Sequence, residues 1–197
     1  MYSHLYIFEN HLSFLQIVGG TETRVGEFPF SVLIGGTEKK CIKINRGKEV
    51  CKDIENWVCS GVLLNNQFVL TAAHCKDNFA ENLKLRLGIH FVAGKDDQSN
   101  NNPHVQNFDI PSENFVIHEE YTKEKKIVKN DIALIKLPRP AQLNPLTQPA
   151  CWKTQSPINS KPVVVGWGKT DAAQTSSDRI NGLYSNKQYK LEVMENY

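Results

Sequence analysis

A histidine within Leu70–Cys75 and an aspartate just before Ile132–Leu137 are the residues of this chain best suited to acid–base chemistry. His74 follows an apolar run and two alanines, whose small side chains allow a tight turn that carries the imidazole out of the core. Asp131 precedes an apolar run, so its carboxylate can be buried at the start of a strand. Acyl transfer needs an imidazole that changes charge near neutral pH and that a buried carboxylate holds in one tautomer. Taken singly, each residue also fits a plainer interpretation, a core or surface histidine and a turn aspartate.

The elements that must position these two residues are predicted to be short strands. Apolar or alternating runs rich in Val, Ile and Phe recur, and Gly, Pro, Asn and Asp separate them. No segment longer than about ten residues has a helical period. The pattern predicts an all-β protein, a sandwich or a barrel. The expected strands are Phe28–Ile34, Trp57–Leu64, Phe68–Thr71, Leu83–Leu87, Val105–Ile110, Asn114–His118, Ile132–Leu137, Val163–Trp167 and Tyr189–Val193.

Several polar stretches interrupt this pattern. Three long insertions, Gly35–Asn56, Lys95–His104 and Lys169–Lys187, are expected to be surface loops. The mixed-charge run His118–Lys126 is expected to be a solvated loop as well. A proline-rich stretch, Pro138–Pro149, is the best candidate for a crossing between two lobes.

Composition indicates a globular chain with no unusual charge. The 197 residues are 40% hydrophobic and 22% charged, with a formal charge of +2, which suits one domain or two small packed lobes. This balance gives no reason to expect a nucleic acid or a membrane surface as partner. No apolar run is long enough for a transmembrane helix. The N-terminal apolar stretch is broken by Glu9, Asn10 and His11, so it makes a poor signal peptide.

The chain contains five cysteines, and none of them forms a C-x-x-C pair or a zinc-type spacing. They are either a set of disulfides or buried free thiols. Under the disulfide interpretation, an odd number leaves at least one partner outside this chain. The cysteines are Cys41, Cys51, Cys59, Cys75 and Cys151.

Four segments in a consistent order carry a family signal. They are IVGG at Ile17–Gly20, LTAAHC at Leu70–Cys75, NDIALIKL at Asn130–Leu137 and VVGWGKT at Val164–Thr170. Together they resemble the chymotrypsin/trypsin family of serine endopeptidases, from Ile17 to the last residue. One segment alone would be a weak signal, and the four in register are specific.

The resemblance implies a chymotrypsin-like double β-barrel, with the first barrel nearly complete and the second incomplete. Residues 1–16 would lie outside the family domain, and residues 17–197 would form a trypsin-like peptidase domain that is incomplete at its C-terminus. By the same resemblance His74 is the catalytic base and Asp131 the carboxylate that accepts its Nδ1–H. Protein or peptide substrates are implied and no cofactor is. Some relatives bind calcium in the loop after Arg86-Leu87-Gly88, and Asp96 and Asp97 are the only nearby carboxylates of note here. Two exposed aspartates are more often a solvated turn, so no metal site is inferred.

The family pattern breaks at the nucleophile. The family order is His, Asp and then a Ser within Gly-Asp-Ser-Gly-Gly, and these 197 residues contain no such stretch. The chain as given is therefore expected to be inactive, and its substrate specificity is unreadable because the pocket residues follow the nucleophile. The serines after Asp131 lie in polar loops without flanking glycines: Ser156, Ser160, Ser176, Ser177 and Ser185.

The activation site also departs from the family. Family zymogens are commonly cut after Arg or Lys, which frees the amine of the residue that matches Ile17. Here Gln16 precedes that expected activation N-terminus. The activating protease is therefore unreadable.

The resemblance also implies a disulfide between Cys59 and Cys75, which would pin the turn that holds His74. Cys41 and Cys51 lie inside the first insertion and most simply pair with each other, although sequence alone does not fix connectivity. Cys151 matches a cysteine that in many family members bonds a separate light chain, and a buried free thiol is the alternative.

The insertions and LRLGIHF at Leu85–Phe91 resemble arthropod proteases that carry a clip domain. A missing light chain or clip domain is therefore a candidate partner through Cys151. Family and cysteine usage imply an extracellular location. Two other functions stay open: a non-catalytic serine-protease homologue acting as a binding or regulatory protein, and a short form retained as a small interaction protein.

Overall fold

The structure, a computed structural model, describes residues 20–44, 48–78, 83–92, 102–124, 127–151, 163–168 and 188–192. Its elements are almost all strands, so the prediction of an all-β protein is confirmed. None of the helical segments in these ranges is long and apolar enough to cross a membrane. The elements are β1 Thr21–Glu22, β2 Ser31–Ile44, β3 Lys48–Leu63, β4 Phe68–Thr71, the 3-10 helix η1 Ala73–Asn78, β5 Leu83–Leu87, β6 Gln106–Ile110, η2 Ser112–Asn114, β7 Phe115–Ile117, β8 Thr122–Glu124, β9 Ile127–Lys129, β10 Ala133–Lys136, β11 Val163–Gly166 and β12 Tyr189–Glu192.

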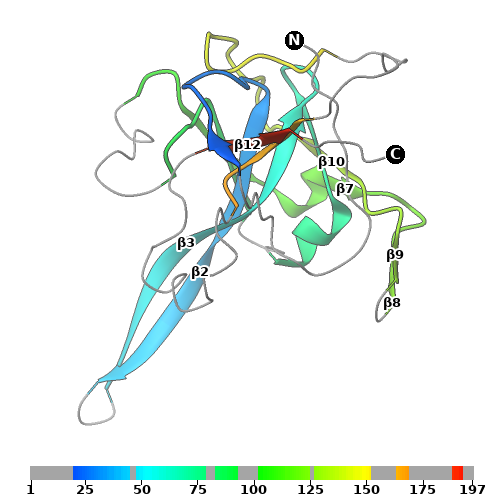
Figure 1. The fold of residues 1–197 in the computed structure, drawn as a ribbon. Helices are drawn as coiled ribbons and strands as arrows, with labels where there is room; N and C mark the ends of the chain where they lie inside the picture. Colours follow the sequence, from blue (N-terminus) through cyan, green and yellow to red (C-terminus); the bar gives the residue numbers. More distant parts are fainter. Residues whose placement is uncertain are drawn as a thin grey trace.

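A curled seven-stranded antiparallel sheet, in the order β6-β5-β2-β3-β4-β10-β7, forms the first lobe (Figure 1). Side chains alternate between the two faces of a strand. In β6 the burial alternates strictly, and in β10 Ala133 and Ile135 are buried while Leu134 and Lys136 face outward. The inward set makes one apolar core inside the curled sheet, and its fully buried members include Val32, Ile34, Leu63, Val69, Leu85 and Ile135.

A second, three-stranded antiparallel sheet in the order β1-β12-β11 represents the other lobe in the described residues. Trp167, directly after β11, is buried against Leu33 and Ile89 on the outside of the first lobe. Its indole Nε1 donates a hydrogen bond of 3.1 Å to the carbonyl of His90. The GWG segment therefore attaches the second sheet to the first lobe.

Two segments expected to be loops contain strands instead. The insertion Gly35–Asn56 continues β2 and β3 into a long hairpin that projects from the sheet (Figure 1). It contains no proline, and its few β-branched residues are interspersed with charged ones, a composition that suits a ribbon exposed on both faces. The run His118–Lys126 contributes β8, which pairs with β9 in a second, short hairpin. Polarity at both positions reflects exposure to solvent rather than a lack of strand structure.

Candidate active site

His74 and Asp131 meet because β4 and β10 are antiparallel neighbours. The register pairs Thr71, the last residue of β4, with Ala133, the first residue of β10. Asp131 lies two residues before Ala133, so the ladder direction places it level with the turn that follows Thr71. His74 is the second residue of η1, which begins in that turn. Residues far apart in the sequence are thus brought together by one strand pair.

Asp131 contacts His74 through both carboxylate oxygens. Oδ2 lies 2.7 Å from the imidazole Nδ1, and Oδ1 accepts the backbone N–H of His74 at 2.8 Å. An ionised carboxylate only accepts hydrogen bonds, so this pairing assigns the proton to Nδ1 and leaves Nε2 as the basic nitrogen. The Asp131 side chain is 13% exposed and the His74 side chain 47% exposed. The carboxylate is therefore shielded, while the imidazole is open to solvent and to a substrate.

Asn130 sets the direction in which Asp131 leaves the chain. Its φ is 52°, the only positive value at a non-glycine residue in the described ranges. The turn is closed by a hydrogen bond of 2.8 Å from the N–H of Ile132 to the carbonyl of Asn130. The Asn130 side chain donates to the carbonyl of Glu120 at 3.0 Å. Asparagine tolerates this left-handed conformation better than most residues.

Substitution of Asn130 tests this turn. We expect Asn130→Ala to lower the free energy of unfolding by about 1–2 kcal/mol, because alanine is strained at this φ and the bond to Glu120 is lost. Asn130→Gly loses the same bond without backbone strain, so it should cost less. Urea denaturation of both variants gives the comparison. Equal losses would show that the left-handed conformation contributes nothing.

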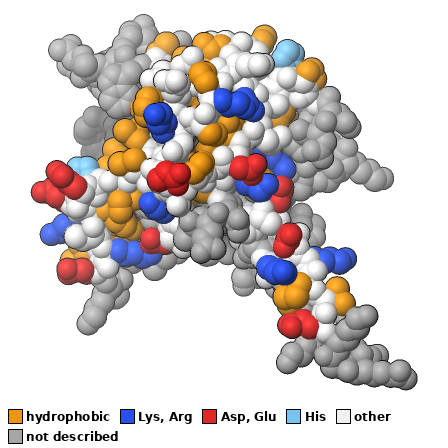
Figure 2. Space-filling model, turned by 180° about the vertical axis from the view of Figure 1, so that it is seen from behind, with side chains coloured by type: hydrophobic (Ala, Val, Ile, Leu, Met, Phe, Trp, Pro, Cys, Tyr) orange, Lys and Arg blue, Asp and Glu red, His pale blue; other side chains and the backbone are white. Residues whose placement is uncertain are grey.

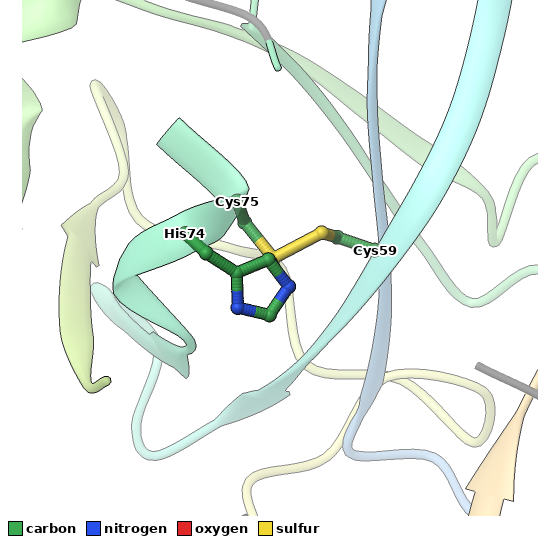
Figure 3. A group of neighbouring side chains, drawn as sticks. All are labelled: Cys59, His74 and Cys75. Atoms are coloured by element: carbon green, nitrogen blue, oxygen red, sulfur yellow. A yellow bond between two sulfur atoms is a disulfide. The ribbon is translucent and has the colours of Figure 1, made fainter. Parts of the chain in front are cut away.

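The 3-10 helix that carries His74 is fastened on three sides. Cys75 is disulfide-bonded to Cys59 of β3, with a Cα–Cα distance of 6.2 Å, and Figure 3 shows the imidazole beside this bond. The Lys76 ammonium donates to the carbonyl of Phe115 in β7 at 2.9 Å. Just before the helix, the hydroxyl of Thr71 donates to the carbonyl of Ser60 at 2.9 Å. The backbone around His74 is therefore held by neighbours on both sides of β4.

Two clusters in the described ranges have metal-type ligands close together, Cys59 with His74 and Cys75, and Cys41 with Glu49 and Cys51. Each cluster contains a disulfide. Metal binding by cysteine requires the thiolate, which a disulfide sulfur is not. Neither cluster therefore offers a three-ligand set in this oxidised form.

Tyr121 lies beside the site and carries an unusual phenol. Its hydroxyl is buried and has no hydrogen-bond partner in the part of the chain that the structure describes. Burial raises the pKa of Tyr121 above its ordinary value, and the carboxylates of Asp77 and Asp131 raise it further. The phenol therefore stays neutral to a higher pH than an exposed tyrosine.

Removing this hydroxyl should be harmless. We expect Tyr121→Phe to leave the free energy of unfolding unchanged or to raise it by up to about 1 kcal/mol, because a buried donor without a partner carries a desolvation cost. Tyr121→Ala also removes a ring packed against the core, so it should cost at least about 2 kcal/mol. Thermal unfolding by circular dichroism separates the two. A clear loss in the Phe variant would indicate a hydrogen bond that the hydroxyl makes in solution.

The other predicted site residues are placed as follows. Cys41 and Cys51 are disulfide-bonded across the β2–β3 hairpin, and Cys151 is exposed with a free thiol. Ile17, Asp96 and Asp97 and the five candidate serines lie outside the described residues. Sequence reasoning missed Thr71, Tyr121 and Asn130. Of these, only Asn130 had a local signal, an asparagine where a strand begins.

Comparison with known proteins identifies relatives of this chain. The Trypsin family model matches residues 17–194. Phenoloxidase-activating factor 3 of Holotrichia diomphalia is 30% identical over 174 residues, which are 83% of this chain and 46% of that protein. Melanization protease 1 of Drosophila melanogaster is 31% identical over 182 residues, 84% of this chain and 42% of that protein. The chain thus spans less than half the length of these relatives.

A solved structure supports the same architecture. The structure of GrC superposes with a TM-score of 0.61 at 22% sequence identity, over 89% of this chain and 64% of that one. At this identity the likeness concerns the fold alone. The double-barrel architecture expected from the sequence is in agreement with it.

Proposed function

The chain belongs to the trypsin family, and from this premise we propose that it is a serine-type endopeptidase domain in which His74 is the general base and Asp131 its orienting carboxylate. One observation carries the proposal, the contact of both Asp131 oxygens with His74. The phenoloxidase-activating factor and the melanization protease among its relatives support the same reaction class. Substrates would be proteins or peptides.

In this mechanism each residue has a defined task. Asp131 fixes the tautomer with hydrogen on Nδ1, so that Nε2 takes the proton of a serine hydroxyl as that oxygen attacks the peptide carbonyl. The imidazolium that forms is stabilised by the shielded carboxylate 2.7 Å away. The same Nε2 then returns the proton to the leaving amine. The family's Gly-Asp-Ser-Gly-Gly stretch would supply the serine and the hydrogen-bond donors that stabilise the oxyanion. The 197 residues do not contain this stretch.

The second candidate is a non-catalytic serine-protease homologue that binds or regulates other proteins. The two candidates share one fold and differ in whether a nucleophile is brought to Nε2. The short-isoform alternative is a special case of the second. The retained pair of His74 and Asp131 favours the catalytic one.

The proposal extends to location and assembly. Two disulfides in 197 residues suit an extracellular protein. The exposed thiol of Cys151 suits a bond to a light chain or clip domain. Activation would free the amine of Ile17, as in family zymogens.

A chimaera tests the catalytic proposal. The 197-residue chain is joined to the nucleophile-bearing C-terminal segment of an active trypsin-family protease and incubated with chromogenic peptide substrates. We expect hydrolysis that a serine-directed acylating inhibitor stops and that His74→Ala removes, while the 197-residue chain alone gives background rates. A chimaera that is folded by circular dichroism, free at Ile17 and still inactive would favour the non-catalytic homologue.

A further inference from the structure

The β2–β3 hairpin extends well beyond the sheet that holds the candidate active site. Pairing of β2 with β5 ends at Gly36, whereas pairing of β2 with β3 continues to Ile44 and Lys48. We call residues 37–44 and 48–56 the ribbon. It projects from the body of the protein in Figure 1, and Figure 2 shows charged and hydrophobic side chains interleaved along it. Such a two-stranded ribbon is only marginally stable by itself.

The base of the ribbon is anchored to the lobe by Arg86 of β5. Its guanidinium lies 4.4 Å from the ring centroid of Trp57, and its Nη2 donates to Glu55 at 2.7 Å. The Arg86 side chain is only 9% exposed, so the pair is partly desolvated. Gly35 leaves room for the indole, because a Cβ at this position would lie 2.5 Å from a ring carbon of Trp57. Farther out, the Cys41–Cys51 disulfide joins the two strands.

These two fastenings hold the ribbon in one shape before any partner arrives. A preorganised surface loses less conformational entropy on binding than a flexible one. The anchored ribbon is therefore suited to binding another protein.

The two faces of the ribbon differ in charge. Residue pairs alternate between the faces along an antiparallel ladder. Among the ribbon residues whose side chains the structure describes, one set of pairs contains one lysine and three acidic residues (Lys39, Glu49, Asp53 and Glu55), and the other contains two lysines and no acidic residue (Lys40 and Lys52). The first set is Thr37–Glu55, Lys39–Asp53, Cys41–Cys51 and Lys43–Glu49, and the second is Glu38–Ile54, Lys40–Lys52, Ile42–Val50 and Ile44–Lys48.

The second set contains a like-charge pair. Lys40 and Lys52 are both exposed and directly opposite each other, an arrangement that destabilises a ribbon. Next to them, Ile54 is 41% exposed and Val50 is half-buried. On the other face, by contrast, Lys39 is opposite Asp53. We call Lys40, Val50, Lys52 and Ile54 the lysine face.

We propose that the lysine face is a docking surface for an extended acidic segment of a protein partner. Carboxylates of the segment lie against Lys40 and Lys52, which removes the repulsion between the two ammonium groups. Apolar side chains of the segment cover Ile54 and Val50. The attraction acts between exposed charges, so it weakens as salt is added. The proposal is independent of catalysis, because it requires neither His74 nor a nucleophile.

The test uses the 197-residue chain and three labelled ten-residue peptides in which leucine alternates with glutamate, glutamine or lysine. Fluorescence anisotropy should show that the glutamate peptide binds most tightly and that added NaCl weakens it. Lys40→Glu/Lys52→Glu should weaken its binding about tenfold. The matched control, Lys129→Glu/Lys136→Glu, makes the same change in net charge at two exposed residues outside the ribbon and should leave binding unchanged. Ile54→Ser should weaken binding of the glutamate peptide and of the glutamine peptide to the same extent.

Two results would overturn the proposal. Equal weakening by both double variants, each folded by near-ultraviolet circular dichroism, would mean that net charge alone attracts the peptide. Unchanged peptide binding together with new self-association of Lys40→Glu/Lys52→Glu in light scattering would mean that the lysines only keep exposed strands of different molecules apart.

Discussion

Asp131→Asn in the serine-bearing chimaera is expected to lower kcat by about 10⁴-fold. The asparagine oxygen can still accept the backbone N–H of His74, so the turn should survive. Its amide group, however, places a donor opposite Nδ1, which favours the tautomer with hydrogen on Nε2. That tautomer cannot take the serine proton. Because the lost interaction acts in the transition state, KM should change little.

The control for this prediction is Asp77→Asn. Asp77 lies near the site and pairs with Lys123 at 3.1 Å, but both side chains are about half exposed. Exposed ion pairs contribute little, so kcat should stay within about threefold. A fall of less than about tenfold for Asp131→Asn would contradict the role assigned to this carboxylate.

Most strands of the first lobe can be predicted from the sequence, because their side chains alternate between one apolar core and the solvent. The expected bounds Phe68–Thr71 and Leu83–Leu87 coincide with β4 and β5. Phe68–Thr71 is an apolar run that follows Asn65 and Asn66, and Leu83–Leu87 alternates leucine with a charged residue between Asn82 and Gly88. The ribbon was missed for the opposite reason. Lys39, Lys40 and Cys41 are consecutive and exposed, so both faces of the strand meet solvent there and no alternation against a core marks it in the sequence.

The candidate site is readable only in part. The pairing of His74 with Asp131 rests on the family resemblance, since no local pattern relates residues 57 positions apart. Local sequence also says nothing of the second bond from Asp131, to the His74 backbone, because it depends on the register of β4 and β10. The buried phenol of Tyr121 likewise results from packing of separate segments.

The hydrogen bonds and the disulfide that hold η1 explain how an exposed imidazole keeps one position. The Asp131 bonds orient the ring, and the Cys59–Cys75 disulfide ties the next residue to β3. The disulfide is buried, at 4% exposure for Cys59 and 2% for Cys75, so it is part of the core as well as a clamp. Its removal should therefore affect the stability of the whole lobe.

Replacing this disulfide, with Cys59→Ala/Cys75→Ala, is expected to lower the free energy of unfolding by about 3 kcal/mol, as for a closed loop of this length. The two cysteines are 16 residues apart, and the released chain includes β4. Cys41→Ala/Cys51→Ala is the matched control, with a separation of 10 residues. That bond lies in the ribbon, outside the core, so its loss should free the ribbon locally and shift the main transition by less than about 1 kcal/mol. Urea denaturation followed by far-ultraviolet circular dichroism measures both variants. Equal shifts would mean that the ribbon and the lobe unfold as one unit.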